Sequence, residues 1–367
     1  MNAVGGGESI PQVRLDNAEV WEAIRPRLEE LITTGRFTLG PAVEEFEAAA
    51  AQAFGCPWAV GTSSGMSALV LALRAAPLRA RARVAIPANT FYAVFEAVVV
   101  AGYVPVITDH DEDYLLSAEI LEPLDVDAVV AVHLYGLPVD MVSLMELARE
   151  RGWWVLEDAS QAHGATVDGR PVGSLGHAAA FSAYPTKNLG AWGDAGFVTG
   201  ADPFVASRIR SLRHHAQREG NVHEDVGGTD RLDALQALVL TEKLRRLREE
   251  VRRRRQVAGW YHEALSGLDL DLPDDRGGRT HCYHQFVVRV PHRDRVRARM
   301  AELGVATGIH YPTPIHLQPG ARNRCDVPAT PKRAEEWAGQ LLSLPMFPGL
   351  GGHEVDRVAS ALGVALG

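Results

Sequence analysis

The sequence predicts an α/β protein in which a large domain, built on a mostly parallel, doubly wound sheet, precedes a smaller α+β domain. Strand-like and helix-like segments alternate over residues 58–157, which is typical of parallel strands joined by crossover helices. A long helical pattern covers residues 231–265, after a stretch at 159–201 that is rich in Gly, Ala and Ser. The 367 residues, 46% hydrophobic and 23% charged, allow two soluble domains, which we expect at 1–240 and 241–367.

Local patterns predict the elements in chain order. Residues 1–17 have little periodicity and are expected to form an arm. Helical spacing of apolar residues predicts helices at 20–32, 41–54, 66–76, 92–101, 139–151, 203–213 and 231–265. Short apolar runs predict strands at 58–60, 83–87, 104–108, 128–133, 153–157, 179–182 and 196–199. The smaller domain is expected to contain a strand at 285–290, a helix at 293–303 and a terminal helix after residue 354.

The charge balance disfavours two classes of partner. With 37 basic and 46 acidic residues the net charge is −9, so the chain gains no general attraction to nucleic acid or to an anionic membrane. Its 3 cysteines are too few and too scattered for a disulfide framework or a zinc site. Residues 1–7 do not resemble a signal peptide, and the most apolar stretch, at 91–107, is too short to span a membrane. We therefore expect a cytoplasmic protein.

Lys187 is the first candidate for chemistry. The chain contains only Lys187, Lys243 and Lys332 as lysines, and the last two stand among charged residues on predicted surface helices. Lys187 instead lies in Phe-Ser-Ala-Tyr-Pro-Thr-Lys-Asn-Leu-Gly, a loop without another charge. A loop lysine is usually just solvent-exposed. A primary amine can form a Schiff base, which arginine cannot, so this lysine is a candidate nucleophile.

Asp158 is the second candidate, because it ends a predicted buried strand. Ligands of open α/β sheets gather at the carboxyl ends of strands. A carboxylate there can keep a pyridine nitrogen protonated, which makes the ring an electron sink. The plain alternative is that Asp158 caps the following turn. Glu157 is expected to face the opposite side of the sheet.

The third candidate is the loop Gly-Thr-Ser-Ser-Gly-Met-Ser at residues 61–67, between a predicted strand and a helix. Small residues let backbone N–H groups approach an anion, and the helix N-terminus favours negative charge. A plain helix cap explains this loop equally well. Together, the three segments supply a phosphate cradle, a partner for a ring nitrogen and an imine-forming lysine, and pyridoxal 5′-phosphate needs all three.

Several longer motifs occur in a characteristic order. They are Gly-Pro at 40–41 with Phe-Glu at 46–47, Pro-Ala-Asn-Thr-Phe at 87–91, Val-His-Leu-Tyr-Gly-Leu-Pro-Val-Asp at 132–140, Glu-Asp-Ala-Ser-Gln-Ala-His-Gly-Ala at 157–165, residues 181–190, Arg-Leu-Asp-Ala-Leu-Gln-Ala at 231–237, Ile-His-Tyr-Pro-Thr-Pro-Ile-His at 309–316 and Leu-Ser-Leu-Pro-Met-Phe-Pro at 342–348. From about Gly35 onward the chain resembles the DegT/DnrJ/EryC1/StrS family of sugar aminotransferases. These belong to the fold-type I group of pyridoxal phosphate enzymes.

The resemblance implies a role for each matching residue. Lys187 would hold the cofactor as a Schiff base, and Asp158 would pair with its pyridine nitrogen. Gln161 would hydrogen-bond the ring hydroxyl, and Phe91 would stack on the ring. The phosphate would be held by Ser64, Gly65 and Ser182. Pyridoxamine 5′-phosphate would be the second form of the cofactor.

Two positions depart from the commoner family pattern. Met66 stands where Ser-Gly-Thr has its Thr, so the site there offers no hydroxyl. Thr229 stands where Gly-x-Asn-x-Arg has the Asn that is given to the neighbouring subunit. The resemblance implies a homodimer with shared active sites, in which residues 227–231 reach the partner's cofactor.

Other residues fit weaker expectations. His310, Tyr311 and His316, with the pair His214 and His215, are candidates for substrate contacts, although structural roles are equally open. The His-Cys-Tyr-His segment at 281–284 resembles a metal pair but lacks a second pair of ligands, so we expect no metal. The Arg-rich stretch at 245–255 is expected to be a solvated helix face with i,i+4 ion pairs.

The implied reaction moves an amino group from L-glutamate or L-glutamine to a nucleotide-linked keto-deoxysugar. Alternatives within the family are a cyclitol or other cyclic ketone aminotransferase and an aromatising amino-acid synthase. Related sugar 3-dehydratases replace the lysine by His, and this chain keeps Lys187. A more distant alternative is a non-catalytic regulator on the same fold, which the intact Lys187, Asp158 and Gln161 disfavour.

Overall fold

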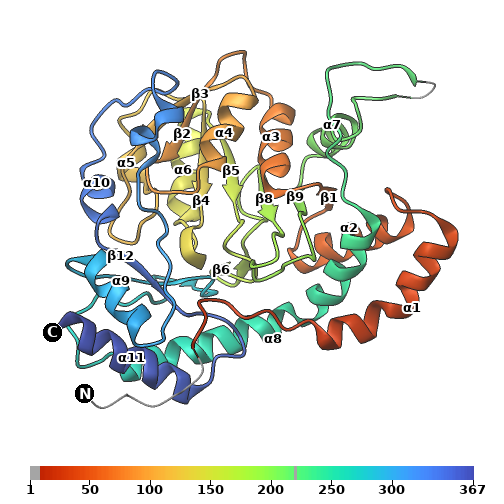
Figure 1. Cartoon of the computed structure of the whole chain (residues 1–367). Coiled ribbons are helices and arrows are strands. Elements are labelled where there is room, and N and C mark those ends of the chain that lie inside the picture. The colour runs from red at the N-terminus through yellow and green to blue at the C-terminus, as the bar shows by residue number, and fades with distance from the viewer. Residues whose placement is uncertain (1–8, 219–220) are drawn as a thin grey trace.

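The computed structural model describes residues 9–218 and 221–367 and contains a large sheet with helices around it (Figure 1). The strands of the sheet are β1 (Trp58–Thr62), β2 (Arg83–Pro87), β3 (Val104–Thr108), β4 (Ala128–Val132), β5 (Trp154–Asp158), β8 (Ala178–Ser182) and β9 (Gly196–Gly200). Their order is β1-β9-β8-β5-β4-β2-β3. Neighbours from β8 to β3 are parallel, whereas β9 is antiparallel to both β8 and β1. Within this sheet only β9 runs against the others, as expected for a mostly parallel sheet.

Helices cover both faces of the sheet because its strands are apolar on both sides. The helices of this part are α1 (Ala18–Thr34), α2 (Pro41–Ala53), α3 (Gly65–Ala75), α4 (Ala93–Val100), α5 (Ala118–Leu121), α6 (Met141–Arg151), α7 (Pro203–Leu212) and α8 (Ala234–Ala264). Successive strand residues point to opposite faces. Ala180 packs in a cluster with α3, α4 and α7, whereas Phe181 packs with α2 and α8. The sheet is therefore doubly wound.

A smaller unit follows α8. It contains β11 (Phe286–Arg289), β12 (Leu341–Leu344), α9 (Arg293–Glu302), α10 (Lys332–Ala338) and α11 (Gly352–Leu366). The two strands are antiparallel, and a separate apolar cluster joins the second half of α8 to β11 and α11 through Tyr261, Phe286 and Leu362. Ile10 pairs with Val305 of this unit, so the described part of the expected arm lies against it. The predicted boundary at residue 240 falls within α8 and stays a prediction.

Several short elements were not predicted, because two residues are too few to show a periodicity. A small sheet has the order β10-β6-β7 and consists of β6 (Thr166–Val167), β7 (Arg170–Pro171) and β10 (Arg279–Thr280). A 3₁₀ turn, η1 (Leu134–Gly136), follows β4. In the described parts of the chain, no helix has the length and apolar character that a membrane span requires.

Candidate active site

The residues expected to bind the cofactor lie on loops at the carboxyl edge of the large sheet. Asp158 is the last residue of β5, and Lys187 follows β8. Ser64 lies between β1 and α3, and Phe91 follows β2. These strands run in the same direction, so their carboxyl ends meet at one edge, where open α/β sheets bind ligands.

Lys187 is a half-buried lysine with an unusual pKa. Burial lowers the pKa of its ammonium group to about 8, while the carboxylate of Asp158 acts in the opposite direction. No hydrogen bond or ion pair joins Nζ to any residue that the structure describes. At pH 7 such a group contains far more neutral amine than an ordinary lysine, and the neutral amine is the nucleophilic form. Lys187 is thus suited to a covalent bond with an aldehyde.

Three buried histidines lie within electrostatic reach of Lys187. Burial lowers the pKa of His163 to about 3 and that of His310 to about 4, and the charge of Lys187 lowers both as well. Burial and Lys187 also lower the pKa of His284 well below its ordinary value. All three rings are therefore neutral at pH 7. His284 belongs to the segment that resembled a metal pair, but the described residues contain no cluster of three metal-ligating side chains.

Asp158 keeps one carboxylate oxygen available in the site. Its side chain is buried, and Oδ1 accepts a hydrogen bond from the backbone N–H of Ser160 at 3.1 Å. Oδ2 has no hydrogen-bond partner within the described chain. As expected, Glu157 points to the opposite side, where it accepts a hydrogen bond from His133 and others from backbone N–H groups of residues 173, 175 and 176.

Gln161 is held between two tyrosines. Its Oε1 accepts the backbone N–H of Tyr135 at 2.8 Å, and its Nε2 donates to the hydroxyl of Tyr311 at 3.1 Å. The hydroxyl of Tyr135 donates to the carbonyl of His310. The ring of Phe91 lies 5.7 Å from that of Tyr311, centroid to centroid, and is 56% exposed. The predicted residues Phe91, Gln161, His310 and Tyr311 are thus brought together.

Sequence reasoning missed Tyr135, although it lies in a motif that carried the family resemblance. The φ angle of Tyr135 is 61°, in the left-handed region that a bulky residue rarely adopts. This turn directs its N–H group toward Gln161. A Tyr-Gly pair shortly after a buried strand was the available signal, but only the fold reveals which side chain it meets.

The loop between β1 and α3 is shaped for an anion. Ser64 caps α3, since its Oγ accepts the backbone N–H of Ser67 at 3.0 Å. A Cβ on Gly65 would lie 2.4 Å from Cβ of Ser182, so only glycine lets that serine approach the start of the helix. Two hydroxyls and the N-terminus of α3 therefore meet at one place. The side chain of Met66 packs against the main apolar cluster, so it can offer the site only its backbone N–H.

Thr229 and His316 form hydrogen bonds with residues other than those placed around Lys187. The hydroxyl of Thr229 forms a hydrogen bond with Nε2 of His215 at 3.2 Å, and the adjacent Asp230 accepts one from Ser67 at 2.8 Å. Residues 227–231 thus lie beside the anion cradle of their own chain, whereas Thr229 was expected to act in a neighbouring subunit. Nε2 of His316 contacts Glu335 of α10 at 2.9 Å. Their binding roles stay predictions.

These groups together fit pyridoxal 5′-phosphate. An amine without a partner and a carboxylate oxygen without a partner suit its aldehyde and its ring nitrogen. An exposed aromatic ring suits its flat face, and the cradle at α3 suits its phosphate.

Comparison with known proteins agrees with this geometry. The model of the DegT/DnrJ/EryC1/StrS aminotransferase family matches residues 19–363. The chain belongs to this family. It is 38% identical over 364 residues to UDP-N-acetyl-3-dehydro-alpha-D-glucosamine 3-aminotransferase of Acidithiobacillus ferrooxidans, covering 96% of this chain and 97% of that protein. It is 39% identical over 361 residues to dTDP-3-amino-3,4,6-trideoxy-alpha-D-glucose transaminase of Streptomyces venezuelae, covering 95% and 94%.

Solved structures of this sugar aminotransferase family share the fold. DesV of Streptomyces venezuelae, in complex with a ketimine intermediate, matches with a TM-score of 0.91 and 38% identity, over 97% of this chain and 98% of that one. NtdA of Bacillus subtilis, with bound pyridoxamine phosphate, matches with a TM-score of 0.90 and 26% identity, over 100% and 86%. The fold-type I architecture, the aminotransferase activity and the pyridoxal phosphate cofactor expected from the sequence are thereby confirmed.

Proposed function

We propose that this enzyme transfers the amino group of L-glutamate or L-glutamine to the ketone of a nucleotide-linked keto-deoxysugar. The observation that carries the proposal is the half-buried Lys187 beside Asp158, at the carboxyl edge of the sheet. Relatives at 38% and 39% identity are named as transaminases of UDP- and dTDP-linked sugars, which supports this class of acceptor.

Lys187 is proposed to bind the cofactor's aldehyde carbon and to move the proton of the reaction. Bound pyridoxal phosphate supplies an electron sink for the charge left on the substrate carbon. Nζ of Lys187 would hold the cofactor and, when not bonded to it, would serve as the base at that carbon. Its pKa of about 8 lets it accept and return a proton near neutral pH.

The other residues are proposed to hold the cofactor in position. Oδ2 of Asp158 would accept a hydrogen bond from the protonated ring nitrogen, and Gln161 would form a hydrogen bond with the ring hydroxyl. Phe91 would cover one face of the ring. Ser64, Ser182 and the first N–H groups of α3 would bind the phosphate, where Gly65 leaves the necessary space. The backbone N–H of Met66 would contribute to this set, and His310 and Tyr311 would meet the substrate.

We further propose a cytoplasmic homodimer in which residues 227–231 approach the partner's active site, with Thr229 as the contact. Exposed apolar side chains near this segment support an interface there. Val226 is 79% exposed, Val222 56% and Phe204 64%. Large apolar side chains gathered on one surface are typical of association sites.

The test compares Lys187→Ala with Lys243→Ala, a control lysine on α8. The parent enzyme and Lys243→Ala should carry the yellow cofactor band, and borohydride should fix the cofactor to Lys187, as peptide mapping would detect. Lys187→Ala should lose multiple turnovers with dTDP- or UDP-linked keto-sugars as acceptors. Normal turnover by Lys187→Ala would refute the proposal. Bleaching of the band by L-glutamate or by L-glutamine identifies the donor.

A further inference from the structure

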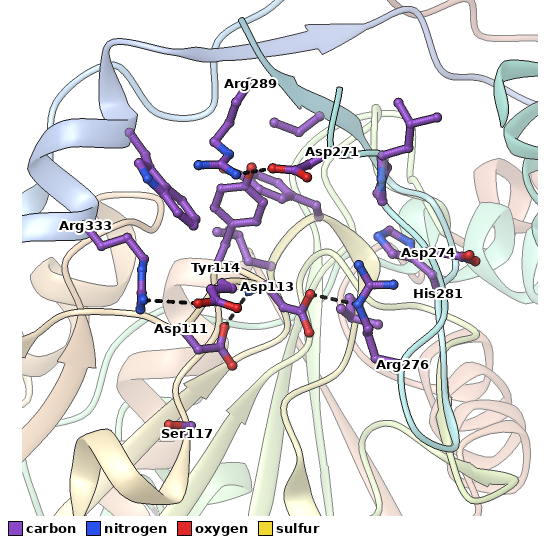
Figure 2. A pocket seen from close by; sticks show the side chains of 18 of the residues that line it. Asp111, Asp113, Tyr114, Ser117, Asp271, Asp274, Arg276, His281, Arg289 and Arg333 are labelled. Carbon is purple, nitrogen blue, oxygen red and sulfur yellow. Dashed lines mark hydrogen bonds and ion pairs between the residues drawn. The ribbon is translucent and has the colours of Figure 1, made fainter. Parts of the chain in front are cut away.

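A second cavity, of about 870 Å³, lies beside the candidate active site (Figure 2). One wall consists of residues 111–117, after β3, and of η1; the other consists of residues 270–274, β11 and α10. We call it the interdomain cavity. Tyr135 stands between the two sites, because its backbone N–H donates to Gln161 while it also lines the cavity. Lys187 and Asp158 are not part of the lining.

The lining of the interdomain cavity has a surplus of negative charge. Six carboxylates and three guanidinium groups line it. Each guanidinium is already paired with one of these carboxylates, as Arg276–Asp113 (3.0 Å), Arg333–Glu112 (3.6 Å) and Arg289–Asp271. The carboxylates of Asp111, Glu119 and Asp274 form no ion pair with any described residue. In Figure 2, Asp111 and Asp113 lie on one side of the cavity, and Asp271 lies on the other.

A buried histidine in the lining has an unused donor. His281 is 2% exposed, and its Nδ1 accepts the backbone N–H of Tyr283 at 2.8 Å. Burial lowers the pKa of the ring to about 3, so the ring is neutral and its proton sits on Nε2. Nε2 has no hydrogen-bond acceptor in the described parts of the chain. This donor is open to the cavity, where a ligand oxygen can accept its hydrogen bond.

Asp111 has an unused acceptor on the opposite wall. Its Oδ1 accepts the backbone N–H groups of Asp113 and Leu115, both at 2.9 Å, which leaves Oδ2 for a ligand. Burial and the neighbouring Asp113 raise the pKa of this carboxyl. A bound cation would reverse that effect by stabilising the ionised form. Tyr114 and Trp337 add aromatic surface between these polar groups.

We propose that the interdomain cavity binds an amino sugar that carries no phosphate. Its ammonium group would pair with Asp111 or Asp274, and a ring hydroxyl would accept a hydrogen bond from Nε2–H of His281. A nucleotide sugar does not fit, because its phosphates would meet the surplus carboxylates. The choice of an amino sugar among organic cations rests on the proposed function, which places an amino group on a sugar ring.

The experiment is calorimetric titration of the dimeric enzyme in its pyridoxamine phosphate form. That form has no aldehyde, so the amine of a probe cannot react at the cofactor. The probes are glucosamine, its neutral counterpart glucose, and UDP. The variants are Asp111→Asn and Asp274→Asn, with Asp125→Asn as the control. Asp125 is fully exposed and lies outside the cavity.

At pH 6.5 glucosamine is expected to bind at least about tenfold more tightly than glucose. The reason is that a hydrogen bond to a charged group raises the affinity about tenfold or more. At least one of the variants Asp111→Asn and Asp274→Asn should weaken the binding of glucosamine by about fivefold to tenfold, and Asp125→Asn should leave it unchanged. Raising the salt concentration should weaken the binding of glucosamine and leave the binding of glucose unchanged.

Three results would overturn the proposal: no detectable glucosamine binding, equal affinity for glucose and glucosamine, or unchanged affinity in both cavity variants. UDP binding that Asp111→Asn strengthens would assign the cavity to a nucleotide and would also overturn it. The cavity variants should keep the cofactor band and the amination rate of the parent enzyme. An enzyme that binds glucosamine as described but fails to aminate any keto-sugar would contradict the proposed function alone.

Discussion

The half-buried side chain of Lys187 is less favourable for folding, and more reactive, than an exposed lysine would be. Its ammonium group loses water on folding, which disfavours the charged form and lowers the pKa from 10.5 to about 8. The carboxylate of Asp158 compensates only in part. The charged form of Lys187 therefore destabilises the folded apoprotein.

The apoprotein of Lys187→Met should be more stable than the parent at pH 7. The folded-state pKa lies below the unfolded one, so the unfolded chain binds more protons between pH 8 and 10.5, and the parent gains stability as the pH rises through that window. The variant should gain up to about 3 kcal/mol at pH 7, and this gain should shrink toward zero above pH 10.5. Urea unfolding of both apoproteins at several pH values measures the difference.

Lys332→Met is the matched control, because Lys332 is exposed. It should leave the stability nearly unchanged at every pH. A gain for Lys187→Met of the same size at pH 7 and pH 10.5 would indicate better packing by methionine and would contradict the charge argument.

Single residues differ in how far the sequence alone predicted them. Lys187 was predictable because lysine is rare in this chain and its loop carries no other charge. Asp158 was predictable because it ends a buried strand. Tyr135 and His284 were not predicted as parts of the site, since each reaches it through a backbone turn or a second domain. Those contacts depend on three-dimensional packing that no local pattern records.

At the scale of elements, β5 presents two adjacent carboxylates to opposite faces of the sheet. Asp158 faces the candidate site, while Glu157 is fully buried on the other face. Glu157 accepts three backbone N–H groups and a hydrogen bond from Nε2 of His133. Nδ1 of His133 accepts the N–H of Val139, which fixes the ring proton on Nε2. This network anchors the chain around residues 173–176 to β5.

Glu157→Gln should destabilise the protein by about 3–5 kcal/mol, because an amide group would face donors that require an acceptor. Hydrogen bonds from His133 and from the backbone lower the pKa of Glu157, although its burial opposes this. The carboxylate therefore stabilises the fold above its ordinary pKa of 4.5, and that stabilisation is lost as the pH falls through the lowered value. Chemical unfolding at pH 7 and near pH 4 measures both effects.

The exposed Glu44→Gln variant is a suitable control on α2. Glu157→Gln and the parent should differ less in their free energy of unfolding as the pH is lowered. If this difference does not decrease, the charge of Glu157 is not the stabilising feature.

Elements were predictable where their patterns were long. The strands of the large sheet and the longer helices between them were recovered within a few residues, whereas the one-turn helix α5 was missed. The strands β6, β7 and β10 were missed, because two residues are too few to show an alternation of apolar side chains. The pairing of β10 with β6 also joins Thr280 to Thr166, which are far apart in the sequence. Helix α10 has 7 residues and no sustained apolar spacing.

For the whole molecule, the exposed apolar side chains near α7 predict where a second subunit binds. Val226→Asp should weaken the proposed dimer by about tenfold or more, because a buried carboxylate without a partner opposes association. Sedimentation over a range of protein concentrations measures the effect. Val364→Asp is the matched control, since Val364 is 58% exposed on α11. Equal dissociation constants for both variants would show that the interface lies elsewhere.

The interdomain cavity is a feature that only the whole molecule reveals. Its lining comes from five separate stretches between residues 111 and 337. Each stretch alone looks like an ordinary polar loop or a helix end. The surplus of negative charge arises from their assembly.

The pairing of β1 with β9 affects how the protein folds during its synthesis on the ribosome. β1 pairs along its whole length with β9, Trp58 opposite Gly200, so about 140 residues must be translated between the two partners. At roughly 5–20 residues per second, the first strand waits roughly 7–28 s on the ribosome before its partner emerges. Its other main neighbour, α2, packs against α8, which ends still later. The N-terminal segment therefore stays without its main packing partners until α8 has been made, and its apolar side chains remain uncovered during that interval.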